Sequence, residues 1–98
     1  MDETLLHFDH RRRTYKPRPH VHEFLKEMSN YYDLVVFTAG MKDYADWLLN
    51  DLDREKLITK RLYRNSCSFC KGTYLKDLTR VTRDLTKVVI IDNMPDNF

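Results

Sequence analysis

Hydrophobic residues recur at helical spacing in two stretches of the chain. In the first, Val21, Phe24, Leu25 and Met28 fall at positions i, i+3, i+4 and i+7, directly after Pro19. Apolar side chains at this spacing line one face of a helix. The second stretch has the same spacing and comprises Met41, Tyr44, Ala45, Leu48, Leu49 and Leu52. The pattern therefore predicts two amphipathic helices, one beginning near residue 21 and the other near residue 41.

Two other stretches are continuously apolar, namely Leu34–Phe37 and the Val-Val-Ile-Ile run at residues 88–91. Such runs are too short for a helix and are typical of buried strands. Residues 61–64 and Thr73–Leu75 are further strand candidates, and residues 76–85 have the spacing of a partly buried helix or turn. Helices that alternate with fully apolar strands predict an α/β fold with a parallel sheet covered on both faces.

The composition fits one small globular domain over residues 1–98, because 42% of the residues are hydrophobic and only 2 Gly and 3 Pro interrupt them. The net charge of +2 is too small to indicate nucleic-acid binding. No apolar run approaches the length that spans a membrane. Two cysteines are too few for a disulfide framework, and the first eight residues hold no secretory signal. Both features indicate an intracellular protein, nuclear or cytoplasmic.

A charged connector occupies residues 9–19 and includes Arg11, Arg12 and Arg13. Its proline and charge content predicts an exposed segment, with room for only a tight turn or a short hairpin at residues 9–16. The three arginines are either a solvated surface or a basic rim for an acidic or phosphorylated peptide. The sequence leaves both interpretations open.

The two cysteines, Cys67 and Cys70, are spaced as C-x-x-C. A zinc site needs about four ligands, and the histidines of this chain show no paired spacing near the cysteines. A redox pair usually opens a helix of a thioredoxin-like unit, which the surrounding pattern does not predict. We therefore interpret the spacing as coincidental.

Polar residues follow the predicted strands. Thr38 comes directly after the first apolar run, Asp92 and Asn93 follow the last one, and Lys76 follows Thr73–Leu75. Ligands of an open parallel sheet bind at the carboxyl ends of its strands. A hydroxyl and an ammonium group neutralise phosphate oxygens, whereas carboxylate and amide oxygens hold Mg²⁺. The set therefore predicts a site that handles a phosphoryl group.

Each of these residues also has an ordinary structural interpretation. Thr38 is able to cap the following helix, Asp92 and Asn93 are common in turns, and Lys76 is able to lie in solvent. It is the order and placement of the whole set along the chain that favours the phosphoryl site.

Four segments together resemble the motifs of the haloacid dehalogenase superfamily. More narrowly, they are similar to its FCP/SCP-type small C-terminal-domain phosphatases and Dullard-type phosphatases. The segments are Asp2-Glu3-Thr4-Leu5, Val36-Phe37-Thr38-Ala39, Tyr74-Leu75-Lys76-Asp77-Leu78 and Val89-Ile90-Ile91-Asp92-Asn93. The resemblance covers nearly the whole chain. It implies a Rossmann-like three-layer fold with a parallel central sheet, truncated at both ends in this chain.

The resemblance also implies a Mg²⁺-dependent phosphatase that acts on a phosphorylated protein or peptide through an aspartyl-phosphate. Asp2 matches the general acid and base of that reaction, and its backbone carbonyl matches a metal ligand. Thr38 and Lys76 match the hydroxyl and the cation that contact the phosphate.

Three further assignments follow from the same resemblance. Asn93 matches a metal ligand. Asp92 beside it is expected to belong to the metal site as well and to link Lys76 to it. Arg64 and Lys71 are candidates for contacts with the substrate's phosphate or peptide.

The sequence departs from the family pattern in two places. The nucleophilic aspartate of the first motif would stand immediately before Met1, so the chain as given is expected to be an inactive internal piece of a larger domain. The strand that the family places between those ending at Thr38 and Asp92 is expected to lie outside the chain as well. In addition, residues 9–16 replace a strand-rich insertion of the family, so substrate preference does not carry over.

Two other functions are compatible with the sequence. A non-catalytic module of the same fold, similar to a subunit of the mitochondrial translocase, would bind a peptide without hydrolysing it and would be mitochondrial. The presence of Asp2, Thr38, Lys76 and Asn93 argues against it, since binding alone does not need all four. Nucleic-acid binding through residues 11–18 is disfavoured by the small net charge. The oligomeric state stays open.

Overall fold

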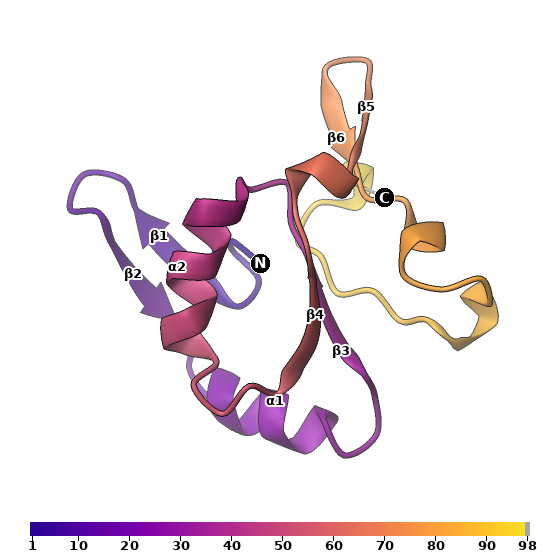
Figure 1. Cartoon of the computed structure of the whole chain (residues 1–98). Coiled ribbons are helices and arrows are strands. Elements are labelled where there is room, and N and C mark those ends of the chain that lie inside the picture. Colours follow the sequence, from indigo (N-terminus) through magenta and orange to yellow (C-terminus); the bar gives the residue numbers. More distant parts are fainter. Residues whose placement is uncertain (98) are drawn as a thin grey trace.

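The structure is a computed structural model that describes residues 1–97. The chain forms two α-helices and three two-stranded sheets within these residues (Figure 1). In chain order the elements are β1 (Leu6–Asp9), β2 (Thr14–Pro17), α1 (Val21–Met28), β3 (Leu34–Phe37), α2 (Lys42–Leu52), β4 (Ile58–Leu62), β5 (Ser68–Cys70) and β6 (Thr73–Leu75). A short 3₁₀ turn lies between β4 and β5 at Arg64–Ser66, and three more follow β6 at Leu78–Arg80, Leu85–Lys87 and Pro95–Asn97.

Both predicted helices are confirmed. α1 begins at Val21 and α2 begins at Lys42, one residue after the first apolar position of its predicted stretch. The apolar face of α2 supplies the centre of the core, because Ala45, Leu48 and Leu49 are completely buried. This face joins one cluster with residues of β1, α1 and β3, namely Leu6, Val21, Leu25 and Val36.

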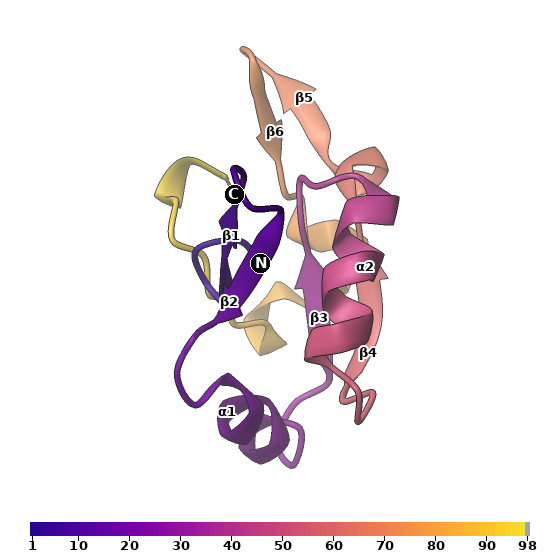
Figure 2. The ribbon, with the colours of Figure 1, turned by 90° about the vertical axis from the view of Figure 1, so that its left-hand side faces the viewer.

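The predicted parallel sheet is represented by one parallel pair. β3 pairs with β4, with Val36 opposite Arg61 and Phe37 opposite Leu62. The chain crosses from β3 to β4 through α2, which packs alongside the pair (Figure 2). β3 is therefore confirmed, whereas β4 begins at Ile58, three residues before the predicted strand at residues 61–64.

The prediction of a buried strand at residues 88–91 is wrong. This run is irregular and pairs with no strand among residues 1–97, and Val89 and Ile91 are 73% and 63% exposed. A strand needs a neighbouring backbone to accept and donate its hydrogen bonds. No neighbour of this kind lies beside the run in the described part of the chain, so its apolar composition alone does not make it a strand.

The charged connector forms the predicted short hairpin. β1 and β2 are antiparallel, with Asp9 opposite Thr14, and Arg11, Arg12 and Arg13 lie in the exposed turn between them. The Asp9 carboxylate accepts hydrogen bonds from the backbone N–H groups of Arg11 and Arg12, which closes the turn. The segment is thus more ordered than an exposed loop, although its arginines are solvent-exposed as expected.

The second hairpin is formed by β5 and β6. Cys70 is part of this hairpin, whereas Cys67 lies just before it in the sequence. Lys71 and Gly72 form its two-residue turn, and both have positive φ angles of 50° and 78°. This conformation is that of a type I′ turn, which matches the twist of the strands and favours glycine. Cys67 lies in extended backbone just before β5, and Cys70 ends it. Three residue steps of extended chain separate their Cα atoms by roughly 10 Å, which is beyond the reach of a disulfide.

The helices that the structure describes are all shorter or more polar than a membrane-crossing helix.

Candidate functional site

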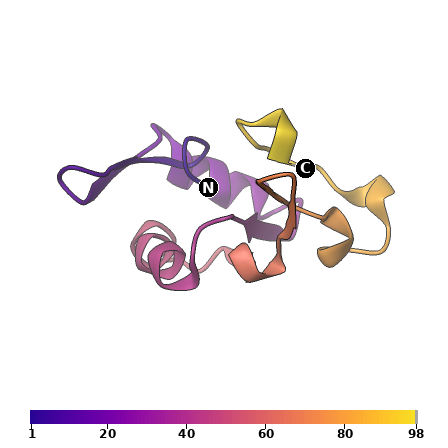
Figure 3. The ribbon, with the colours of Figure 1, turned by 90° about the horizontal axis from the view of Figure 1, so that it is seen from above.

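A hollow of about 600 Å³ opens where the loop after β3 meets the N-terminal segment and the residues after β6. Seen from above, the N-terminal segment lies between α2 and the C-terminal part of the chain (Figure 3). The lining includes five of the predicted residues that come from distant parts of the sequence: Asp2, Thr38, Lys76, Asp92 and Asn93. The predicted substrate-contacting residue Arg64 lines it as well.

Thr38 is held at the carboxyl end of β3, where its backbone N–H donates to the carbonyl of Leu62 at 2.9 Å. Its hydroxyl oxygen accepts a hydrogen bond of 3.0 Å from the N–H of Gly40. The N-cap of α2 is Met41, so Thr38 does not cap the helix. Because the hydroxyl oxygen already accepts one bond, its proton is left to donate to an anion in the hollow.

Lys76 is buried, which excludes the interpretation of a solvated charge. Its Nζ donates to Oδ2 of Asp92 at 2.5 Å, and the other oxygen of Asp92 accepts from the backbone N–H of Met94 at 3.0 Å. Burial by itself raises the pKa of Asp92, but the hydrogen bonds from Lys76 and Met94 outweigh burial and the pKa is lowered. The ionised Asp92 therefore fixes the ammonium group of Lys76 at the wall of the hollow.

Asp2 reaches the hollow from a short N-terminal segment whose backbone forms an isolated bridge with Leu6. Its Oδ1 accepts a hydrogen bond of 3.1 Å from the hydroxyl group of Tyr44, in the first turn of α2. Burial and the charge of Asp2 raise the pKa of Tyr44, so the hydroxyl stays protonated at neutral pH. The sequence pattern assigned Tyr44 only to the apolar face of the helix. The hydroxyl group of this side chain was the one feature of the sequence that indicated a contact with the site.

Arg64 lies at the hollow, whereas Lys71 does not. Arg64 donates from Nε to the carbonyl of Ala39 at 2.6 Å, and its guanidinium lies 4.9 Å from the centre of the Tyr74 ring. It is thus fixed beside the loop that carries Thr38. Lys71 lies in the exposed β5–β6 turn and does not line the hollow, so the structure does not bring it together with the other candidates.

The oxygen atoms of the hollow fit a magnesium ion in part. Asp2 and Asn93 supply the hard oxygen donors that Mg²⁺ prefers, and both line the hollow. Each oxygen of Asp92 already accepts a hydrogen bond, one from Lys76 and the other from Met94. The role of Asp92 is therefore to fix the position of the lysine. Within residues 1–97, no three His, Cys, Asp or Glu side chains gather as they do at a protein-only metal site.

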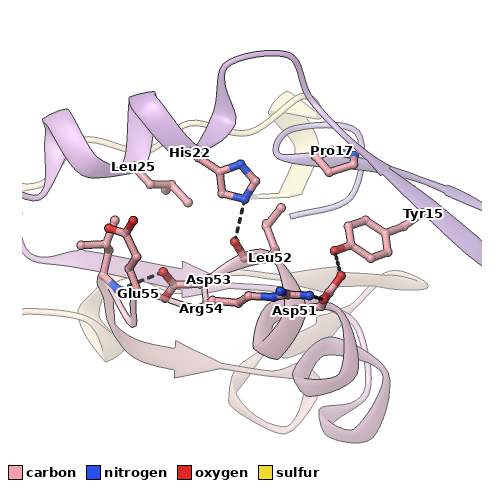
Figure 4. A pocket seen from close by; sticks show the side chains of 10 residues that line it. Tyr15, Pro17, His22, Leu25, Asp51, Leu52, Asp53, Arg54 and Glu55 are labelled. Atoms are coloured by element: carbon pink, nitrogen blue, oxygen red, sulfur yellow. Dashed lines mark hydrogen bonds and ion pairs between the residues drawn. The ribbon is translucent and has the colours of Figure 1, made fainter.

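A second hollow, of about 460 Å³, lies at the opposite end of α2 and contains none of the predicted residues (Figure 4). Most of its polar side chains are hydrogen-bonded within the fold. Asp51 accepts from the hydroxyl of Tyr15 and from Arg54, and Nε2 of His22 lies 3.0 Å from the carbonyl oxygen of Leu52. These contacts join the β1–β2 hairpin and α1 to the end of α2, so we interpret this hollow as a seam of the fold.

Comparison with known proteins gives a consistent result. The model of the family described as NLI interacting factor-like phosphatase matches residues 1–98. "Phosphatase Herzog" from Drosophila melanogaster is 47% identical over 81 residues, which are 83% of this chain and 23% of that protein. The human "CTD small phosphatase-like protein" is 47% identical over 81 residues, or 83% of this chain and 29% of the relative.

A third relative has a more specific name. The human "Carboxy-terminal domain RNA polymerase II polypeptide A small phosphatase 1" is 46% identical over 81 residues, which cover 83% of this chain and 31% of that protein. The chain thus spans between about a quarter and a third of the length of these three curated relatives.

Proposed function

The chain belongs to the NLI interacting factor-like phosphatase family, and from this premise we propose that it forms the core of a phosphatase that hydrolyses phosphoserine or phosphothreonine in proteins. One observation carries the proposal. Asp2, Thr38, Lys76 and Asn93 belong to four separate segments of the sequence, and all four line one hollow. Residues that served only local turns or solvation would have no reason to converge there.

The proposed reaction assigns a distinct task to each side chain. A phosphate in the hollow accepts hydrogen bonds from the Thr38 hydroxyl and the Lys76 ammonium, which offset its negative charge as the transition state forms. Asp2 gives a proton to the alkoxide that leaves and later takes a proton from the attacking water. The family places the aspartate that carries the phosphoryl group immediately before the position of Met1, outside the 98 residues.

Magnesium is part of the same proposal. The backbone carbonyl of Asp2 and the side chain of Asn93 would hold the ion, and its positive charge would reduce the repulsion between the carboxylates and the phosphate. Asp92 is the residue we remove from the predicted ligand set, because its two oxygens hold Lys76 and the turn at Met94. We propose a reducing compartment, the nucleus or the cytoplasm, because two cysteines in 98 residues are too few for a disulfide framework.

The test is phosphate release by the full-length native protein from phosphoserine and phosphothreonine peptides in the presence of Mg²⁺. We expect release that EDTA abolishes, and a loss of at least about a hundredfold in Thr38→Val and Lys76→Met. Lys26→Met removes a lysine from the exposed side of α1 and is the matched control, with expected wild-type activity. Binding of the phosphopeptide without release would instead support the peptide-binding module, and neither binding nor release would refute both.

A further inference from the structure

Tyr44 is held by the fold on several sides. Its backbone belongs to the first turn of α2, and its ring packs edge-on against Phe8 with 5.2 Å between the ring centres. A Cβ atom added to Gly40 would lie 3.2 Å from the Tyr44 ring, so the loop after β3 also lies close to it. The ring therefore has little freedom, and its hydroxyl group is directed at Asp2.

Asp2 itself lies in a segment with few other restraints. The backbone of the segment is held by the bridge to Leu6 and by turn hydrogen bonds to Met1. Within residues 1–97, the hydrogen bond from Tyr44 is the one that the structure records on the Asp2 carboxylate. Without it, rotation about the side-chain bonds of Asp2 would turn the carboxylate away from the hollow at little cost.

We propose that Tyr44 is the positioning residue for Asp2, since its hydroxyl group binds Oδ1 and leaves Oδ2 to exchange a proton with the substrate. The proposal rests on the function proposed above, in which Asp2 is the general acid and base. Proper placement of such a group within hydrogen-bond reach of the reacting oxygen is what makes proton transfer effective. Tyr44 itself touches neither the phosphate nor the leaving group in this account.

In this proposal Tyr44 acts in the first half of the reaction, in which the phosphoryl group is transferred to the enzyme. The bond between phosphorus and the serine oxygen breaks as the family's aspartate forms its bond to phosphorus, and the proton on Asp2 moves to the departing serine oxygen. A serine alkoxide is a poor leaving group that needs this proton. The nitrophenolate released from p-nitrophenyl phosphate departs without a proton. Misplacing Asp2 therefore slows this step for a phosphoserine peptide but not for p-nitrophenyl phosphate.

The experiment compares Tyr44→Phe with the wild type in the full-length native protein. The substitution keeps the ring against Phe8 and removes only the hydroxyl group. We expect kcat/KM for a phosphoserine peptide to fall about tenfold or more. We expect kcat/KM for p-nitrophenyl phosphate to change by less than about twofold, because this quantity reports only steps up to formation of the phosphoenzyme. An equal fall for both substrates, or no fall for either, would overturn the proposal.

A spectroscopic measurement tests the same contact without requiring activity. At constant pH, the ¹³C resonance of the Asp2 carboxyl group is expected to shift in Tyr44→Phe. It is expected to stay unchanged in Tyr63→Phe, which removes a hydroxyl bonded to Asp46. An unshifted resonance in Tyr44→Phe would overturn the positioning role whatever the kinetics. If the wild type releases no phosphate but the resonance shifts, the proposed function fails and the link between Tyr44 and Asp2 stands.

Discussion

Asp46 offers a quantitative test of how α2 is anchored to the strand that leads into Arg64. Its carboxylate accepts hydrogen bonds from Lys42 at 2.6 Å, Tyr63 at 2.5 Å and Arg61 at 2.9 Å. The first two partners are the main causes that lower the pKa of Asp46 from 3.8 to about 2. Because Tyr63 directly precedes Arg64, this cluster helps to hold the chain that reaches the hollow.

The magnitude follows from the size of the pKa shift. The pKa shift from 3.8 to about 2 corresponds to at most about 2.5 kcal/mol of folding free energy, at about 1.4 kcal/mol per unit. The side chains of Asp46 and Lys42 are 22% and 68% exposed, so solvent screens part of this interaction. We therefore expect Asp46→Asn to lower the free energy of unfolding at pH 7 by about 1 to 2 kcal/mol.

The pH dependence has a definite sign. The pKa of Asp46 is lower in the folded than in the unfolded chain, so the stabilisation is present above the unfolded value and is lost as the pH falls through the folded one. The difference between wild type and Asp46→Asn should thus be constant above about pH 5 and shrink between about pH 4 and pH 2.

Urea unfolding of the full chain at a series of pH values measures this difference. Asp43→Asn is the matched control, because Asp43 is an exposed carboxylate on the same helix and the structure records no hydrogen bond to its side chain. We expect it to change stability by less than about 0.5 kcal/mol. An Asp46→Asn effect that stays the same from pH 7 to pH 2, or that Asp43→Asn reproduces, would refute the reasoning.

Two further predictions concern packing and the cysteines. Leu48→Ala should lower the free energy of unfolding by about 2 to 5 kcal/mol, because Leu48 is fully buried, and Val89→Ala by less than about 0.5 kcal/mol, because Val89 is 73% exposed. Equal losses in urea unfolding would mean that residues 88–91 are buried after all. In the native state, mild oxidation should form no disulfide between Cys67 and Cys70, and a thiol reagent should label the exposed Cys70 before the part-buried Cys67. A disulfide-linked peptide found by mass spectrometry would contradict the extended geometry of this segment.

The local pattern of the sequence was enough to predict α1, α2 and β3. A helix face such as that of Leu48 and Leu52 is a property of spacing within a few turns, and burial of this face follows wherever a core forms. The apolar run at residues 88–91 has the same kind of local signal as β3, and yet it forms no strand. Strand formation depends on a partner backbone, which a pattern within four residues does not specify.

The residues of the candidate site also fall into those that the sequence pattern revealed and those that only the fold revealed. Thr38, Lys76 and Asp92 were recognisable because each directly follows an apolar segment, Asn93 because it stands next to Asp92, and all four because their order resembles known motifs. Lys71 lies only five positions before Lys76 in the sequence, but it occupies the exposed β5–β6 turn and does not line the hollow. Tyr44 was missed because its spacing on α2 is that of a core residue, and only the fold reveals that its hydroxyl meets Asp2.

The amino-acid sequence by itself determined which residues carry charge and hydroxyl groups, which faces of the helices are apolar, and the order of the motifs. Only the tertiary structure decided that Tyr44 holds Asp2, and that residues 88–91 pair with no strand among residues 1–97. The physical reason is the range of the forces involved. Helix periodicity acts between neighbours in sequence, whereas hydrogen bonds of buried polar groups and strand pairing join residues that only folding brings together.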